Sequence, residues 1–248
     1  GIEMNLSKLY QQKHHLWLKI LFASFATDDG MIKTKLYDFS QMAFRHMKWI
    51  AKEILANSDN YNYDRDMKLY KRESLFEILK ALSNNVKTLM QSYPSSTLGQ
   101  RMGSDDTYLL EYISQILQDA SNDAKITAFN MARVWEGLDQ EQIDALTLFL
   151  FAESYKEYEL ILIYSYMQAR TDDRKYFDIY QDLVDESYFH LKSFGNMMAK
   201  LGILALPREL HERSYIIEDL DRFIVDGIAE EEAAKEMCKE LSESITDE

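Results

Sequence analysis

Thr27-Asp28-Asp29-Gly30, followed by Phe44-Arg45-His46-Met47-Lys48, returns 144 positions later as Thr171-Asp172-Asp173-Arg174, followed by Tyr188-Phe189-His190-Leu191-Lys192. In each copy an acidic turn precedes a long apolar helix, and a histidine lies at the same distance beyond the turn. A chain that repeats a helical hairpin can build a four-helix bundle whose matched side chains point inward. The repeat therefore predicts that the two histidines lie opposite one another near the bundle axis.

The whole chain is predicted to be helical. Apolar residues recur at helical spacing almost throughout, strand-like alternation is scarce, and only two prolines interrupt 248 residues. We expect an all-α fold with a four-helix bundle over residues 1–204, built from hairpins at about 5–57 and 139–202 and a helical insertion at 58–138, and then a C-terminal helical extension at 205–248. Two copies of the hairpin favour a bundle over a solenoid, which needs more repeats at a shorter period.

Inside the insertion, a glycine- and serine-rich stretch is expected to interrupt the helices. Pro94 ends one helix, and Ser95–Ser104 is predicted to be irregular. Asp105 is then predicted to cap a new helix that runs to about Asp119.

Charge and composition exclude several function classes. The formal net charge of −14 argues against non-specific binding to nucleic acids or anionic membranes, because both need a basic surface. No apolar run reaches the roughly 18–20 residues of a membrane span, and the N-terminal stretch lacks the features of a signal peptide. The single cysteine, Cys238, excludes an internal disulfide framework and suits a reducing compartment. We therefore expect a cytoplasmic protein without nucleic-acid or membrane partners, and a homo-oligomer stays open.

The second hairpin carries the strongest candidate metal ligands. Glu153 and Glu157 are one helical turn apart, and Glu186 and His190 have the same spacing on the partner helix, so each pair can face one side. Three carboxylates and an imidazole suit iron or manganese, which accept mixed oxygen and nitrogen ligands. The alternative is that Glu157 and Glu186 are solvated surface charges and that His190 is a hydrogen-bonded core residue.

The first hairpin offers fewer ligands. His46 has the place of the second copy's histidine, but Met42 and Ala43 stand where a carboxylate is needed. On the preceding helix, His14 lies near the depth expected of a ligand, while the adjacent His15 is about 100° further around the helix, so only one of the two can point inward. The alternative is that both of these histidines are surface residues.

These segments resemble a known family. Phe22-Ala23-Ser24-Phe25-Ala26, the acidic turn and the segment around His46 resemble the first hairpin of rubrerythrin-like members of the ferritin-like superfamily. The second hairpin resembles that of the family through Glu153, Glu186 and His190. The resemblance covers roughly residues 9–57 and 140–200 and rests on short motifs. It implies a ferritin-like bundle with a di-iron centre, held by a glutamate from each of two helices and Glu-x-x-His from the other two.

The chain departs from the family pattern in several places. Ala43 and Ser187 stand where the glutamates of the two Glu-x-x-His motifs should be, and the first helix has glutamine or histidine in place of its glutamate. No rubredoxin-type Cys-x-x-Cys pair is present, so the electron-transfer module of true rubrerythrins is missing from this sequence. A single metal ion, an asymmetric pair with additional histidine ligands and an empty site are all compatible with the remaining residues.

The sequence leaves two alternative functions. It does not decide whether the chain is an enzyme. In the first, a ferritin-like oxidoreductase or iron-binding protein acts on oxygen or peroxide. The metal would be iron, as a di-iron centre, or manganese. Its ligands would be Glu153, Glu157, Glu186, His190, His46 and one of His14 or His15. In the second, the bundle has lost its metal and serves as a binding or oligomerisation module, as Met42 and Ala43 suggest. A haem-oxygenase-like bundle is a third reading, and the internal repeat counts against it.

Overall fold

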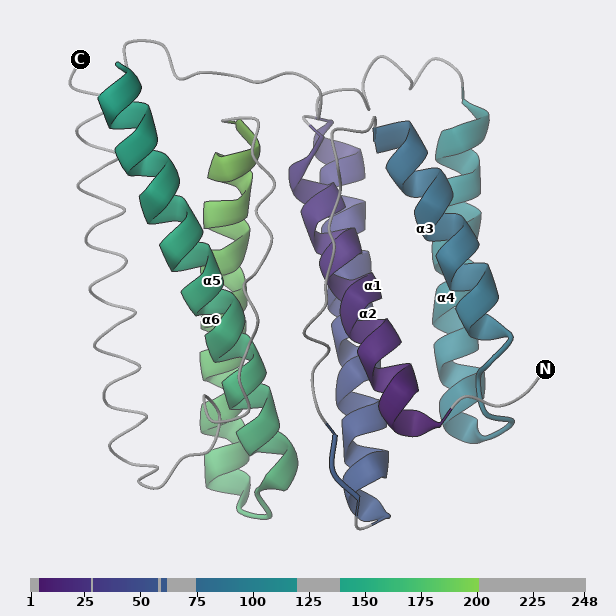
Figure 1. The fold of residues 1–248 in the computed structure, drawn as a ribbon. Helices are drawn as coiled ribbons and strands as arrows, with labels where there is room; N and C mark the ends of the chain where they lie inside the picture. The colour runs from purple at the N-terminus through teal and green to yellow at the C-terminus, as the bar shows by residue number, and fades with distance from the viewer. Residues whose placement is uncertain (1–4, 28, 58, 62–74, 120–138, 201–248) are drawn as a thin grey trace. The chain divides into compact units, whose positions relative to one another are not determined.

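The computed structural model describes residues 5–27, 29–57, 59–61, 75–119 and 139–200. Over these ranges the chain forms helices and no strand, which confirms the all-α prediction for the described part (Figure 1). The helices are α1 Leu6–Phe25, α2 Gly30–Ala56, α3 Leu75–Met90, α4 Thr97–Gln118, α5 Gln140–Arg170 and α6 Arg174–Lys200. None of them is long and apolar enough to cross a membrane.

The chain divides into two compact units. The first comprises Gly1–Ala132 with Gly202–Leu206, and the second comprises Arg133–Leu201 with Pro207–Glu248. Helices α1 to α4 belong to the first unit, and α5 and α6 belong to the second. The two predicted hairpins thus fall in different units, and their assembly into one ferritin-like bundle stays a prediction. The predicted C-terminal extension at 205–248 lies outside the described residues.

The helical hairpin is repeated as the sequence predicted. Helices α2 and α6 are both 27 residues long. In the first turn, Thr27 Oγ1 accepts a hydrogen bond from the Asp29 backbone N–H at 3.1 Å, and Asp29 Oδ1 accepts one from the Met31 N–H at 3.0 Å. In the second turn, Thr171 and Asp173 make the corresponding bonds at 3.2 and 2.9 Å. Because these side chains satisfy N–H groups that a helix start leaves open, the same local sequence produces the same turn twice.

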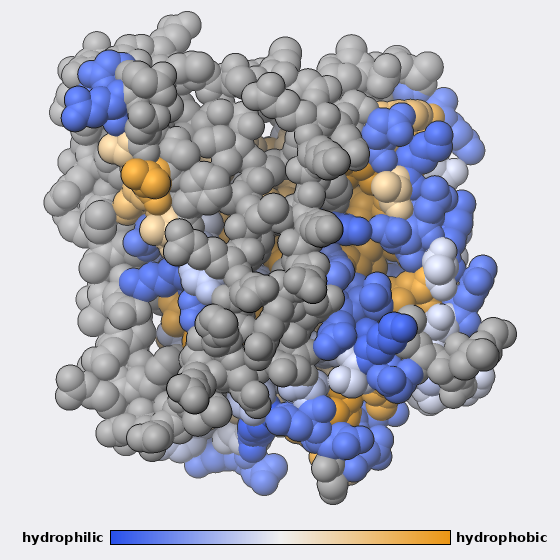
Figure 2. Space-filling model, in the orientation of Figure 1, coloured by the Kyte–Doolittle hydropathy of each residue, from blue (hydrophilic) through white to orange (hydrophobic). Residues whose placement is uncertain are grey.

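Four consecutive helices pack together in the first unit. Helix α1 packs against α2, and α3 packs against α4. Helix α3 also packs against α1, and α4 against α2, so the four helices form a closed ring of contacts (Figure 1). The side chains that fill its interior include the fully buried Leu9, Trp17, Ile50, Leu82 and Ile113. On the face seen in Figure 2, hydrophilic side chains cover much of this unit (right), with smaller hydrophobic areas between them. The predicted insertion therefore supplies two helices that pack directly on the first hairpin.

Helix α4 begins at Thr97, so the prediction of an irregular stretch up to Asp105 was wrong. Ser96 caps the helix, and its Oγ accepts a hydrogen bond from the Gly99 N–H at 3.4 Å. The glycines that suggested a loop lie inside the helix instead. A Cβ on Gly99 would overlap the carbonyl oxygen of Pro94 and lie 2.9 Å from its carbonyl carbon, so glycine is needed for this close approach. Asp105 consequently lies within the helix rather than at its start.

We expect Gly99→Ala to destabilise the first unit by about 1–3 kcal/mol, the usual cost of forcing an extra group into a packed site. The added methyl group would have to push the start of α4 away from backbone atoms of Pro94, which cannot rotate aside. The matched control is Gly103→Ala in the same helix, where a Cβ meets nothing within 4 Å. This control should gain stability, by up to about 1 kcal/mol, from the higher helix propensity of alanine. Urea unfolding followed by circular dichroism measures both, and equal effects of the two substitutions would contradict the steric explanation.

Candidate functional site

Each hairpin carries one buried polar pair at the same place. Lys13 of α1 faces His46 of α2, and Glu157 of α5 faces His190 of α6. The members of each pair are 33 residues apart, and the second pair is the first displaced by 144 positions. The two histidines thus occupy equivalent positions in the two hairpins, but the side chains that face them differ in charge.

Lys13 is the centre of a buried polar cluster in the first unit. Its Nζ donates hydrogen bonds to His46 Nδ1 at 2.9 Å and to Asp106 Oδ2 at 2.7 Å, and it lies 4.9 Å from the centroid of the Tyr93 ring. The side chains of Lys13 and Asp106 are 0% and 1% exposed. Burial lowers the pKa of Lys13, and Asp106 opposes that effect. With a carboxylate at 2.7 Å, the ammonium form is the one that this geometry accommodates.

His46 is held as the neutral tautomer that carries its proton on Nε2. Its Nδ1 accepts from Lys13, and its Nε2 donates to Asp105 Oδ2 at 2.8 Å. Burial lowers the pKa of His46 to about 4, and the charge of Lys13 lowers it further, whereas Asp106 and Asp105 oppose the shift. Both ring nitrogens therefore have protein partners at neutral pH.

Three further side chains complete the cluster. Tyr93 donates its hydroxyl to Asp106 Oδ2, and burial together with the charge of Asp106 raises the pKa of this tyrosine. At the surface end, Arg45 donates to Asp105 Oδ2 at 3.2 Å. Burial alone would raise the pKa of Asp105, but the hydrogen bonds and charges of His46 and Arg45 outweigh it and lower that pKa. A continuous chain of hydrogen bonds thus runs from the exposed Arg45 to the half-buried Tyr93.

The titration of His46 predicts an acid-sensitive fold. Between its ordinary pKa of 6.5 and about 4, the unfolded chain binds a proton that the folded chain does not, so stability falls as the pH falls through this window. The loss attributable to this one group is about 3 kcal/mol, since one pKa unit corresponds to 1.36 kcal/mol. The lowered pKa of Asp105 adds a further loss below about pH 4. Urea unfolding at several pH values between 7.5 and 4.5 measures the slope, and His46→Gln should flatten it. An unchanged slope in that variant would contradict the assignment.

The first hairpin does not fit a metal ion with the residues it has. The lone pair of His46 Nδ1 points at the Lys13 ammonium, and its Nε2 carries a proton that Asp105 accepts. Among the residues that the structure describes, no three or more His, Cys, Asp or Glu side chains are grouped so that they could hold a metal ion.

The second hairpin brings together one of the predicted carboxylates with the predicted histidine. His190 Nδ1 lies 3.2 Å from Glu157 Oε1, and the two side chains are 8% and 1% exposed. The second oxygen of Glu157, Oε2, is buried and has no hydrogen-bond partner among the described residues. Glu153 and Glu186, each one turn away on the same two helices, are half-buried. A buried carboxylate with an open oxygen can accept a cation or a proton.

The remaining predicted ligand, His14, has a packing role in the structure. It is buried, and its ring stacks on that of Trp17 with the centroids 5.9 Å apart, while the adjacent His15 is half-buried. The predicted facing of His46 and His190 across one bundle stays a prediction, because the two residues belong to different units.

The partners of His46 were missed in the sequence. Lys13 and Asp105 bond directly to His46, and Asp106 and Tyr93 extend the cluster beyond Lys13. Lys13 had two available signals, because it lies 144 positions before Glu157 and interrupts an apolar stripe that includes Leu9 and Trp17. Asp105 and Asp106 of α4 had no such signal, because they lie outside the repeated hairpins.

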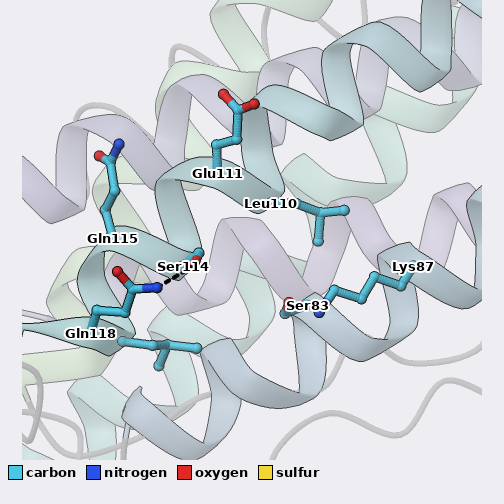
Figure 3. Close-up of a pocket in the computed structure, with 8 residues that line it drawn as sticks. Ser83, Lys87, Leu110, Glu111, Ser114, Gln115 and Gln118 are labelled. Carbon is cyan, nitrogen blue, oxygen red and sulfur yellow. Dashed lines mark hydrogen bonds between the residues drawn. The ribbon is translucent and has the colours of Figure 1, made fainter.

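A groove between α3 and α4 in the first unit has a volume of about 520 Å³ (Figure 3). Ser83 and Lys87 reach it from α3, and Glu111, Ser114 and Gln118 reach it from α4. Gln118 Nε2 donates to Ser114 Oγ at 3.3 Å across one helical turn. The charged groups of the groove, Lys87 and Glu111, are exposed to water. Ser83 is the one buried polar side chain among its lining residues, which is fewer than a small-molecule site usually has to orient a ligand.

Comparisons of the chain with protein-family models, with curated proteins and with solved structures found no match. The resemblance to rubrerythrin-like proteins accordingly stays a prediction from sequence.

Proposed function

We propose that the chain is a ferritin-like helical module for binding or oligomerisation, whose first hairpin contains an internal cation in place of a metal ion. One observation carries the proposal: the Lys13 ammonium lies 2.9 Å from His46 Nδ1, at the position that holds Glu157 in the second hairpin. The lysine supplies the positive charge that a metal ion would bring, and a histidine and an aspartate already use it.

A metal ion could bind His46 Nδ1 only by displacing that ammonium. A bond from a metal such as zinc to a histidine nitrogen is about 2.0–2.1 Å long, so the ion would enter the space of the Lys13 N–H group and bring a like charge against it. Asp106 would lose its buried partner in the same step. A metal centre that uses His46 is therefore disfavoured, and so is oxygen or peroxide chemistry at a complete di-iron site.

A single divalent cation in the second hairpin is the second candidate. Glu157 Oε2 favours it, because this buried oxygen has no hydrogen-bond partner among the described residues and could bind a cation. Glu157 and His190 would supply one oxygen and one nitrogen ligand, a combination that iron(II) and manganese(II) accept. Bound there, the ion would supply Lewis-acid or redox chemistry, and Glu157 would balance part of its charge.

Titration with manganese(II), followed by the electron paramagnetic resonance of the free ion, tests both proposals. We expect the wild type to bind at most one ion per chain, and we expect His46→Gln to leave the number unchanged. An ion that is lost in Glu157→Gln would support the second candidate, whereas no binding at all would contradict it and leave the metal-free module. Two ions per chain, or an ion lost in His46→Gln, would overturn the first proposal.

A further inference from the structure

One face of the first unit combines cations with aromatic rings. We call it the α2–α4 face, and it consists of Lys35, Phe39, Arg45 and Trp49 on α2 with Arg101 and Tyr108 on α4. Most of these residues lie outside both the groove between α3 and α4 and the polar cluster around Lys13. The face is contiguous, because Arg45 contacts Trp49 at one end and borders the same cavity as Tyr108 at the other.

Trp49 holds two guanidinium groups at the surface. The guanidinium carbon of Arg101 is 4.1 Å from the centroid of the Trp49 ring system, and that of Arg45 is 5.1 Å from it. The Arg45 side chain is 55% exposed and donates one hydrogen bond to Asp105, so its remaining N–H groups face outward for a further partner, and Arg101 is also exposed. A guanidinium that lies over an aromatic ring still has its N–H donors in its own plane, where they can bind a carboxylate with two parallel bonds.

Beside this pair lies a cavity of about 430 Å³ that is lined by apolar, cationic and acidic side chains. Phe39 and Met42 form part of its apolar lining, and Lys35 and Arg45 bring two positive charges to it. The exposed Asp38 also lines it, so the cavity keeps a net positive charge of one. Lys35 Nζ donates to the Tyr108 hydroxyl at 2.8 Å, which fixes the ammonium over the aromatic rings. The cavity can therefore take an apolar side chain next to bound anionic groups.

The positive charge of this face is local. The chain as a whole has a formal net charge of −14. The residues that match Lys35, Arg45 and Trp49 in the second hairpin are Ile179, Phe189 and Ser193, so the repeated hairpin forms without these cations. Their presence in the first hairpin alone points to a role other than the folding of the hairpin.

We propose that the α2–α4 face binds an acidic segment of a partner protein. Carboxylates of the segment bind the guanidinium groups of Arg45 and Arg101 beside Trp49, and an apolar residue next to them enters the cavity at Phe39. Charge complementarity of this kind selects the partner and speeds the encounter, while the aromatic ring supplies buried contact area. This inference rests on the proposed binding function and names the class of partner.

A nucleic acid is the less suitable occupant. Its backbone carries one charge per roughly 1.7 Å of duplex, and binding requires many phosphate contacts at once. Three cations on a chain of net charge −14 cannot compensate the repulsion of such a polyanion by the rest of the surface. A short acidic peptide brings fewer charges and can place them at the two arginines.

Fluorescence anisotropy with the full chain tests the proposal. The probe is a labelled peptide of about eight Glu-Ala repeats, and the matched controls are the Gln-Ala peptide and an oligothymidylate of similar charge. We expect the acidic peptide to bind, and we expect Arg101→Gln to weaken it by about tenfold, the effect of losing charge-assisted hydrogen bonds. Lys80→Gln removes an exposed cation of α3 and should change the affinity by less than about twofold.

No binding of the acidic peptide, or equal binding by wild type and Arg101→Gln, would overturn the inference, and so would an oligothymidylate that binds as tightly as the peptide. Thermal melts of both variants must match the wild type, which separates loss of binding from loss of the fold. The manganese titration of the wild type gives its result independently, so failure of this inference and failure of the metal-free module are distinguishable.

Discussion

Lys13→Met is expected to lower the free energy of unfolding by about 3–5 kcal/mol, the usual result of removing one partner of a buried ion pair. Methionine fills much of the same volume, but it leaves Asp106 with its charge buried and takes away the donor that His46 Nδ1 now accepts from. The loss can be measured by urea unfolding, followed by the fluorescence of the three tryptophans, of which Trp17 and Trp49 lie in α1 and α2.

The controls for this experiment separate charge from volume. Lys8→Met removes an exposed lysine of the same helix and should cost less than about 0.5 kcal/mol. In the double variant Lys13→Met with Asp106→Asn, the buried charge is gone, and a substantial part of the lost stability should return. A loss below about 1 kcal/mol in Lys13→Met would show that the ion pair is not what holds α4 against the first hairpin.

Lys13→Glu should convert the cluster from a metal-free arrangement into a divalent-cation site. The substitution places a carboxylate where the second hairpin has Glu157, opposite His46 and next to Asp106. Without metal, the new carboxylate and Asp106 repel one another, so the variant should be less stable than Lys13→Met. One nitrogen and at least two carboxylate ligands would then bind manganese(II) or zinc(II).

The expected readout is a stabilisation by metal that the wild type lacks. An ion present at 100 times its dissociation constant adds about 2.7 kcal/mol of stability through mass action. Lys13→Gln is the matched control, because it removes the ammonium without adding a carboxylate and should gain no such stabilisation. If manganese or zinc stabilises Lys13→Glu no more than Lys13→Gln, the lysine is not what keeps metal out of this hairpin.

The two hairpins show how one local fold can carry different electrostatics. Lys13 and Glu157 occupy the same position of the repeat and face equivalent histidines. In the first unit the ammonium is neutralised by Asp106 of α4, a helix outside the repeat. In the second, Glu157 keeps a buried oxygen without a hydrogen-bond partner among the described residues. The chemistry of each copy is thus decided by a single residue type and by what packs on the hairpin.

The local parts of the fold could be predicted from the sequence. Helix periodicity, the Thr-x-Asp turns and the length of α2 and α6 depend on neighbouring residues, so the repeated hairpin followed from its residues alone. The pair Glu157–His190 followed as well, because a tight turn between two long helices brings positions 33 residues apart to the same level. The start of α4 did not follow, because Gly99 is accommodated by its contact with Pro94 rather than by helix propensity.

Only the tertiary structure decided what surrounds His46. Asp106 lies 93 residues from Lys13, and Asp105 lies 59 residues from His46, on a helix whose sequence has no counterpart in the repeat. The partner of a buried charge is selected by which helices pack together, and neither periodicity nor capping residues record that choice. The same packing lowers the pKa of His46 to about 4, since burial and a neighbouring ammonium act through space and not along the chain.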